Sequence, residues 1–559
     1  MLPMVRRLRG ARMGWNVAPR HRRPHMDLLL PLGVVAGALV ATSLAAGLVE
    51  RAAMSFPILF LGVGLVLGPG VTGTTAIALD DPALLLIAVA TLSLVLFLDA
   101  SNLDLDGLRR DWWVPALTLG PGTLLTIALV GAAAVLLFGL SWPVGLIAGA
   151  ALASTDAVTL RDVLRDRRLP VGLRRSLAVE AGTNDLLVLP ILLILLAVAT
   201  GEAVGVAGWA WFAVQLLLIG PAAGALVGVG GARLMGRVDR HTPIRNEYQS
   251  LYGVGLVFLA FVAGEAVGGS GFLAAFAAGG AVSVSNTTLC DCFLDLGQVL
   301  AEVLMLAAFT VFGVVLSGLL GSVGWVAGIG FALFVLVIAR PVAVGGVLSV
   351  ARTALSPRAI ALIAWNGPRG LASLLLALLA VEAGVPGGEA VFAIVGMVVT
   401  VSVVLHGSTS TPLAGLYARR DCGEVLPEDR TTSATDALRE TDPQDAPRID
   451  VGALAARLDG PDPPWVIDVR SPASRRHDPT VIPGSRWLPP DEVAEWITNL
   501  AEAGGPPALA MWCTCPREAT AARITVLARE HGIEAWAIRG GRQAWQDAGH
   551  PVAAIDLVP

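Results

Sequence analysis

The sequence predicts a multi-span α-helical membrane protein followed by a small α/β domain, and three observations lead to this fold class. Hydrophobic residues make up 55% of the 559 residues and charged residues only 15%, whereas soluble domains carry about 25% charged residues. From Asp27 to about Tyr417, apolar runs long enough to cross a hydrocarbon core of about 30 Å follow one another. After Ile449, short apolar strands alternate with helical segments, which is typical of an α/β fold.

About 13 transmembrane helices are expected in residues 26–417. Arginines in the short loops predict their orientation, because cytoplasmic loops carry an excess of basic residues. The arginine-rich loop from Arg161 to Arg175 is therefore expected in the cytoplasm, together with the C-terminus. The expected spans start near Leu28, Ser55, Pro82, Trp113, Trp142, Leu173, Gly208, Ser250, Gly271, Gly297, Gly321, Pro357 and Gly388.

Residues 1–25 form a basic leader that conflicts with this orientation. They carry arginines from Arg6 to Arg23 and should resist translocation, although 13 spans place them outside the cell. Either the span count is off by one, or the leader is not part of the natural protein. Because Met26 opens directly into the first apolar span, we expect translation to start there.

Carboxylates at membrane depth mark the candidate site. Thr155 and Asp156 end one apolar run, and the next span carries Glu180, Asn184 and Asp185 in its first half. A carboxylate in the middle of a span costs about 2.5–3.5 kcal/mol on insertion scales, so its presence indicates a function. Hydroxyl, amide and carboxylate oxygens are hard donors suited to a small cation such as Na⁺. One carboxylate holds either a proton or a cation, but not both. This competition couples the flux of protons to the flux of cations.

Two simpler interpretations compete with this one. In the first, the helix begins only after Asp185, which leaves the acids in an aqueous loop. Alternatively, the acids form structural ion pairs with Arg340 and Arg369, the two intramembrane arginines. The sequence "GPRG" around Pro368 predicts a broken helix, and unwound backbone at membrane depth is tolerated where it lines a cavity or is buried in protein.

Six short motifs occur in order along the membrane part: "STD" at Ser154, "EAGTND" at Glu180, "GGSGFLAAFAAG" at Gly268, "ARP" at Ala339, "WNGPRG" at Trp365 and "LHG" at Leu405. Through them this part resembles the monovalent cation:proton antiporter-1 family. The resemblance implies a sodium/proton antiporter fold with inverted repeats, a dimerisation domain and a mobile ion-carrying core. It also implies a homodimer with elevator-like alternating access.

Carried onto this sequence, the resemblance assigns roles to individual residues. Asp185 would bind the ion and carry the proton, with Asp156 and Thr155 beside it, and Glu180 would pair with Arg340. The pair formed by Asn184 and Asp185 resembles the electroneutral branch, which exchanges one proton for one Na⁺ or Li⁺. The expected partners are H⁺, Na⁺ or Li⁺ with K⁺ as an alternative, and the lipid bilayer of the cell (inner) membrane. No cofactor and no nucleic acid is expected.

Three departures from the family pattern concern ion selectivity. Ala157 stands where proline is common after the "TD" aspartate, and Ala181 removes a possible hydroxyl ligand after Glu180. In the third span, Asp99 of "LDAS" takes the place of a glutamate and has a shorter reach.

The C-terminal part divides into a linker and a domain. Residues 418–448 are polar, acidic and rich in threonine, as expected of a linker. Residues 449–559 carry "VIDVRSP" at Val466, "VIPGS" at Val481, "WCTCPREAT" at Trp512 and "RGGRQAWQDAGHPV" at Arg539, and they resemble a rhodanese domain. This domain is expected in the cytoplasm.

The rhodanese resemblance makes Cys513 a reactive thiol in a loop whose backbone N–H groups cradle it. Pro516 lacks one such N–H group and Glu518 adds negative charge, so a sulfurtransferase role and a redox or sulfur-sensing role with Cys515 both stay open. Two rival functions of the whole chain also remain. One is a membrane-anchored sulfurtransferase, and the other is a transporter of a sulfur-containing anion that binds Arg340 and Arg369.

Overall fold

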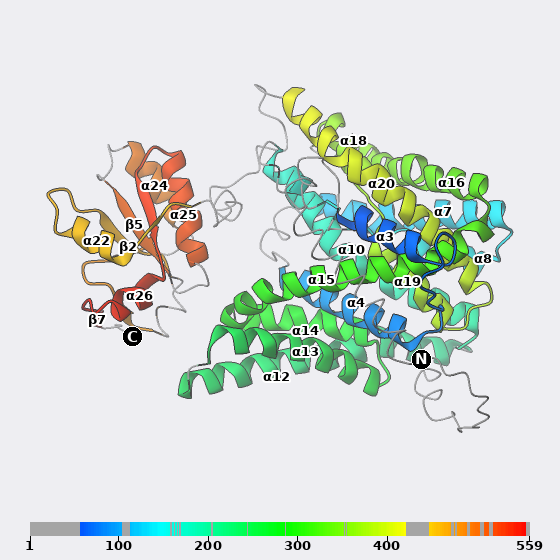
Figure 1. The fold of residues 1–559 in the computed structure, drawn as a ribbon, viewed down its shortest axis with the longest axis horizontal. Helices are drawn as coiled ribbons and strands as arrows, with labels where there is room; N and C mark the ends of the chain where they lie inside the picture. The colour runs from blue at the N-terminus through cyan, green and yellow to red at the C-terminus, as the bar shows by residue number, and fades with distance from the viewer. Residues whose placement is uncertain are drawn as a thin grey trace. The chain divides into compact units, whose positions relative to one another are not determined.

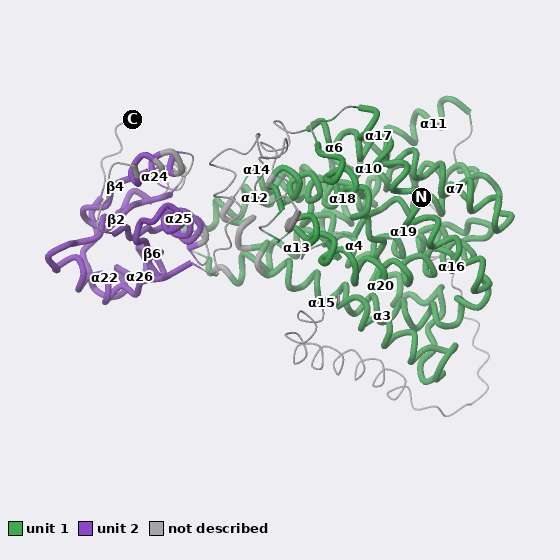
Figure 2. The backbone as a smooth tube through the Cα atoms, turned by 90° about the horizontal axis from the view of Figure 1, so that it is seen from above, with its two compact units in different colours: residues 1–428 green, residues 429–559 purple. Residues whose placement is uncertain are grey.

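The computed structural model divides the chain into two compact units, residues 1–428 and residues 429–559 (Figure 2). It describes residues 56–102, 112–156, 159–160, 163–164, 166, 169–202, 205–242, 244–285, 287–351, 353, 355–420, 446–470, 475, 478–488, 492–502, 508–513 and 518–554. The predicted basic leader, the first predicted span from Leu28, and Cys515 with Pro516 lie outside these residues. The boundary between the units falls inside the predicted linker.

The secondary structure of the first unit, in its described part, consists of helices (Figure 1). Short π-helical turns join α6 to α7, α11 to α12 and α16 to α17. Its helices are α3 (Phe56–Leu67), α4 (Pro82–Asn102), α6 (Trp113–Leu117), α7 (Thr123–Phe138), α8 (Trp142–Ala151), α10 (Val171–Thr200), α11 (Gly205–Val214), α12 (Gly220–His241), α13 (Asn246–Ala266), α14 (Gly271–Ser285), α15 (Thr287–Leu319), α16 (Trp325–Leu333), α17 (Gly346–Val350), α18 (Pro357–Trp365), α19 (Leu371–Glu382) and α20 (Gly388–Arg420).

Eight helical stretches among the described residues are long and apolar enough to cross a membrane. Four further apolar helices are shorter, namely α3, α8, α14 and α19. Large apolar side chains face outward on several spans, including Leu136 at 83% and Val326 at 91% exposure. Such a surface is unfavourable in water and matches lipid. The multi-span prediction is confirmed, whereas the number of thirteen spans stays a prediction.

Small residues allow the helices to approach closely, as is usual in membranes. Helices α12, α13 and α14 lie side by side (Figure 1). At Gly224 of α12, an added Cβ atom would lie only 1.9 Å from the carbonyl oxygen of Ala274 on α14. Gly64 of α3 faces the backbone of Thr310 on α15 at a similarly short distance. The helix packing therefore depends on glycine at these contacts.

The second unit is an α/β fold with a five-stranded parallel sheet in the order β1-β6-β5-β2-β4. The strands predicted from "WVIDVR", "ALAMWC" and "AWAIRGG" are the three central ones, β2, β5 and β6, and all have buried apolar residues. Its strands are β1 (Arg448–Ile449), β2 (Trp465–Asp468), β4 (Arg486–Trp487), β5 (Leu509–Trp512) and β6 (Ala535–Ile538), with β3 (Thr480–Val481) and β7 (Ala553–Ala554) forming a small antiparallel pair; its helices are α22 (Val451–Leu458), α24 (Val493–Glu502), α25 (Ala519–Glu530) and α26 (Gly541–Asp547).

Candidate functional site

Two breaks in helical structure meet at the candidate site. Helix α8 ends at Ala151, and the chain continues without helical structure to Asp156. Helix α18 ends at Trp365 and α19 begins at Leu371, so residues 366–370 are unwound as the "GPRG" sequence predicts. The backbone N–H of Asp156 donates to the carbonyl oxygen of Pro368 at 2.9 Å, which joins the two breaks.

Glycine permits this close approach. A Cβ atom at Gly370 would lie 2.2 Å from Oδ2 of Asp156, and one at Gly367 would lie 1.7 Å from Nε of Arg340. Both distances are far below van der Waals contact. The two glycines around Pro368 thus let the second break lie directly against a carboxylate and a guanidinium group.

Helix α10 brings the predicted polar residues of the second span into the protein interior. It is continuous from Val171 to Thr200, so Glu180, Asn184 and Asp185 lie within it rather than before it. Their exposed fractions are 3%, 0% and 6%. The interpretation that these acids occupy an aqueous loop is therefore wrong.

Hydrogen bonds join the first break, residues 152–156 after α8, to helix α10. Ser154 donates its hydroxyl to Oδ1 of Asp185 at 2.5 Å. The Asn184 amide donates to the carbonyl oxygen of Ala153 and to the hydroxyl of Thr155, each at 3.1 Å. Oδ1 of Asn184 is buried and has no hydrogen-bond partner among the described residues. The arrangement thus leaves a buried amide oxygen available beside a carboxylate.

Three aspartates lie within electrostatic range of one another. Asp156 accepts a hydrogen bond from Thr159 at 2.7 Å, and it interacts unfavourably with Asp185. Asp99, on α4, is partly buried and repels both. A bound proton or cation relieves such repulsion between buried carboxylates. The structure therefore brings Asp99, Asp156, Asp185, Thr155 and Asn184 together.

The two intramembrane arginines are engaged in different ways. Nη2 of Arg340 donates to Oε1 of Glu180 at 2.6 Å, with both side chains almost fully buried, and to the carbonyl oxygen of Asn366 at 3.3 Å. Nη1 of Arg369 donates to the carbonyl oxygens of Ala153 and Ser154, each at 2.7 Å. The structural ion-pair interpretation therefore fits Glu180, whereas Arg369 supports the backbone of the first break.

Neutral residues of the site escaped prediction from the sequence. Ser154, Thr159 and Asn366 contact the predicted residues, and Ser402 and His406 contact the second break from α20. In the sequence, only their place in a motif could have indicated two of these residues, because Ser154 precedes Thr155 in "STD" and His406 lies in "LHG". A charged residue inside an apolar run can be recognised from the sequence, whereas a hydroxyl that becomes buried only in the fold cannot.

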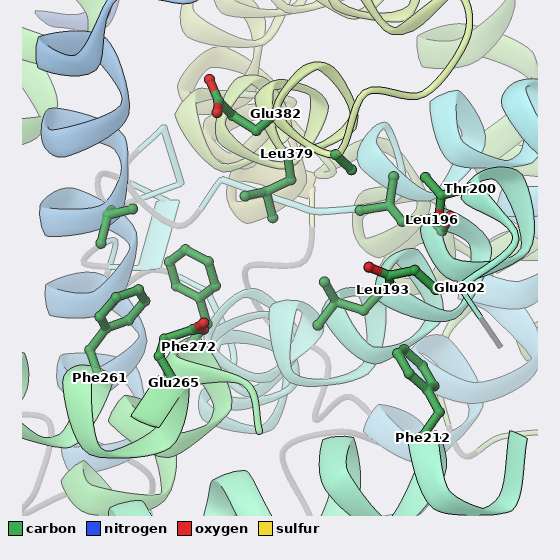
Figure 3. Close-up of a pocket in the computed structure, with 12 residues that line it drawn as sticks. Leu193, Leu196, Thr200, Glu202, Phe212, Phe261, Glu265, Phe272, Leu379 and Glu382 are labelled. Carbon is green, nitrogen blue, oxygen red and sulfur yellow. Dashed lines mark hydrogen bonds between the residues drawn. The ribbon is translucent and has the colours of Figure 1, made fainter. Parts of the chain in front are cut away.

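A cavity of about 120 Å³ lies further along α10 (Figure 3). Its apolar lining includes Leu193, Phe261 and Phe272, and three acidic residues, Glu202, Glu265 and Glu382, also belong to the lining. Oε1 of Glu265 accepts a hydrogen bond from the Gly271 N–H at 2.9 Å. Leu193 follows Asp185 by eight residues, which is about 12 Å along a helix with a rise of 1.5 Å per residue.

In the second unit, Cys513 directly follows β5, is 4% exposed and is disulfide-bonded. Glu518 adopts a left-handed backbone conformation with φ of 54°. Its carboxylate accepts hydrogen bonds from the Gly540 N–H at 2.6 Å and from Nε of Arg448 at 3.3 Å. Glu518 therefore anchors the start of α25 to the turn before α26.

Comparison with known proteins gives consistent matches to the first unit. The family model described as "Sodium/hydrogen exchanger, transmembrane" matches residues 37–415. The K(+)/H(+) antiporter NhaP2 of Shewanella oneidensis is 28% identical over 371 residues, which cover 66% of this chain and 63% of that protein. The K(+)/H(+) antiporter NhaP of Alkalimonas amylolytica is 28% identical over 387 residues, which cover 68% of this chain and 66% of that protein. The chain thus spans slightly less than two thirds of these relatives.

A solved structure is similar as well. The sodium proton antiporter MjNhaP1 from Methanocaldococcus jannaschii at pH 8 superimposes with a TM-score of 0.59 at 21% identity, over 71% of this chain and 100% of that chain. This likeness establishes the fold of the membrane unit.

Proposed function

The chain belongs to the sodium/hydrogen exchanger family, and on that premise we propose that its membrane unit exchanges a monovalent cation for protons across a cell membrane. The observation that carries the proposal is Asp185, a carboxylate buried in the middle of α10 beside two helix breaks. The group that donates a hydrogen bond to Asp185 is the uncharged hydroxyl of Ser154, which does not neutralise the carboxylate as an arginine would.

The donor atoms around Asp185 suit a small cation. Carboxylate oxygens of Asp185 and Asp156, the hydroxyl of Thr155 and the unpartnered Oδ1 of Asn184 would supply hard oxygen ligands. Proton binding to Asp185 removes its charge and releases the cation, and cation binding displaces the proton. A proton or cation bound here would also relieve the unfavourable interaction of Asp99 with Asp185 and Asp156.

The arginines support a cation as the transported species. Arg340 is engaged by Glu180, and Arg369 donates to two carbonyl oxygens. Nε of Arg340 and Nε and Nη2 of Arg369 have no hydrogen-bond partner among the described residues, but an anion that binds there would be repelled by Glu180, which interacts with both arginines. The rival function as a transporter of a sulfur-containing anion is therefore not favoured.

The proposal includes an arrangement in the membrane. With the arginine-rich loop before α10 in the cytoplasm, the cavity near Leu193 and Thr200 is placed toward the opposite side of the membrane. The C-terminal unit is placed in the cytoplasm. Thirteen spans with inverted repeats, a homodimer and an elevator-like movement of the core complete the proposal.

The cation is to be identified by a transport assay. The relatives carry names of K⁺/H⁺ antiporters, whereas the oxygen donors suit Na⁺ or Li⁺ as well. Purified protein in liposomes with an imposed proton gradient and a pH-sensitive dye receives NaCl, LiCl, KCl or choline chloride separately. We expect dequenching with at least one metal cation and none with choline. Intact, inserted protein that responds to no cation would overturn the proposal.

For the second unit we propose a rhodanese-like module in which Cys513 is a redox-responsive thiol. Its support is the position of Cys513 at the end of β5, its burial and its disulfide. A disulfide sulfur is not a nucleophilic thiolate, so sulfur transfer from this residue requires prior reduction. Regulation of exchange by redox state thus fits better than constitutive sulfurtransferase activity.

Replacing Cys513 and Cys515 by serine tests this role. We expect basal exchange to stay unchanged, because the cation site lies in the other unit, and the difference in exchange between dithiothreitol-treated and peroxide-treated protein to disappear. The single variant Cys422→Ser, in the linker, serves as the control and should respond like the wild type. An unchanged redox response in the double variant would contradict the proposal. Thiosulfate:cyanide sulfur transfer by the reduced wild type, absent in Cys513→Ser, would favour the enzymatic role instead.

A further inference from the structure

Two buried polar residues of α20 contact the second helix break, and the function proposed above does not use them. Ser402 and His406 lie four residues apart, with exposed fractions of 0% and 1%. The Ser402 hydroxyl accepts a hydrogen bond from the backbone N–H of Arg369 at 2.7 Å and lies 3.2 Å from Nδ1 of His406. Nε2 of His406 lies 3.1 Å from the carbonyl oxygen of Trp365.

The chemistry of these atoms fixes the direction of each bond. The Trp365 carbonyl can only accept, so Nε2 of His406 donates to it. The Ser402 oxygen already accepts from the Arg369 N–H, and its own hydrogen is free to be donated to Nδ1. Every donor and acceptor is used when His406 is the neutral tautomer with its hydrogen on Nε2.

The resulting chain of hydrogen bonds holds both ends of the break. Trp365 is the last residue of α18, and Arg369 is near the end of the unwound segment 366–370. Backbone groups that leave a helix at membrane depth must find other partners, and α20 supplies them here. Two points of attachment fix the break against a long continuous helix.

This attachment reaches the cation site through Arg369. The same residue that is held at its backbone N–H donates from Nη1 to the carbonyl oxygens of Ala153 and Ser154. Those carbonyls belong to the first break, whose Ser154 and Thr155 side chains contact Asp185 and Asn184. A shift of Arg369 would therefore move the ligands of the proposed site.

We propose that Ser402 and His406 are positioning residues that set the cation affinity of the site by fixing Arg369 and the unwound segment 366–370. The inference rests on the proposed exchange function and assigns these residues no direct contact with the cation. We therefore expect the cation affinity to change and the maximal transport rate to stay the same. Displaced ligands bind the ion more weakly, whereas the movement of the core is unaltered.

The decisive variant is Ser402→Ala, which removes the acceptor of the Arg369 N–H. Because a buried donor without an acceptor is costly, we expect the KM for the transported cation to rise about tenfold, with maximal rate per folded protein within about twofold of the wild type. His406→Leu should act in the same direction. Ser402→Thr keeps the hydroxyl and should restore the wild-type KM.

Ser410→Ala is the matched control. Ser410 lies on the same helix and is equally buried, but its hydroxyl has no hydrogen-bond partner among the described residues. Its KM should equal that of the wild type. If Ser402→Ala lowers only the yield of folded protein or the maximal rate and leaves KM unchanged, Ser402 is merely structural and the inference is wrong.

Hydrogen–deuterium exchange provides a readout that does not need transport. Peptides that cover residues 152–156 and 366–370 should exchange faster in Ser402→Ala than in the wild type or in Ser410→Ala. Unchanged exchange in both segments would overturn the inference. If the wild type transports no cation while these segments respond as expected, the proposed function fails and the attachment of the break to α20 stands.

Discussion

Replacing Asp185 by asparagine is expected to abolish cation/proton exchange while the protein still folds. Asparagine keeps the shape of the side chain, and its Oδ1 atom can still accept the hydrogen bond from Ser154 that Oδ1 of Asp185 accepts now. It can neither bind a proton at physiological pH nor offer a negative charge to a cation. The measurement is cation-induced dequenching in liposomes under a proton gradient, with size-exclusion profiles to show that the variant is intact.

Two further variants make this result specific. Asp185→Glu keeps the charge but lengthens the side chain in a buried site, so we expect residual exchange with an altered KM rather than complete loss. Glu247→Gln removes a carboxylate of the same unit that is 72% exposed at its side chain, and it should exchange like the wild type. Wild-type exchange by Asp185→Asn would show that another group carries the proton, with Asp156 the next to test.

The sequence was informative where charge or a helix-breaking residue stood in an apolar run. Asp185, Asp156 and Glu180 were predictable because an acid in a span needs an explanation, and Pro368 between glycines predicted the break between α18 and α19. The strands β2, β5 and β6 were predictable as short apolar runs bounded by turn residues.

Other features depended on contacts between residues far apart in the chain. Ser154 and Ser402 matter because Asp185 and the Arg369 N–H lie within hydrogen-bond distance, and nothing in the local pattern shows this. The engagement of Arg369 with two carbonyl oxygens, rather than with an acid, follows from the unwound backbone of residues 152–156. Periodicity predicts which face of a helix is apolar, but not which break will lie against it.

The pair formed by Glu180 and Arg340 gives the second prediction with a large effect. Arg340→Met should destabilise the membrane unit by about 3–5 kcal/mol, because it leaves a carboxylate buried without its partner. The double variant Glu180→Gln/Arg340→Met removes both charges and should recover most of that loss, since a buried ion pair contributes little beyond the cost of burying its charges. Thermal unfolding in detergent, followed for all three proteins, measures the order of stability.

An exposed ion pair of the same unit provides the comparison. Arg245 and Glu247 lie 3.6 Å apart with side chains 78% and 72% exposed, so Arg245→Met should leave the unfolding temperature almost unchanged. Unfolding of Arg340→Met at the wild-type temperature would show that water or another group compensates Glu180. A double variant no more stable than Arg340→Met would show instead that Arg340 acts mainly through its bond to the Asn366 carbonyl oxygen, which both variants lose. In that case the guanidinium group stabilises the helix break, and the charge of Glu180 is secondary.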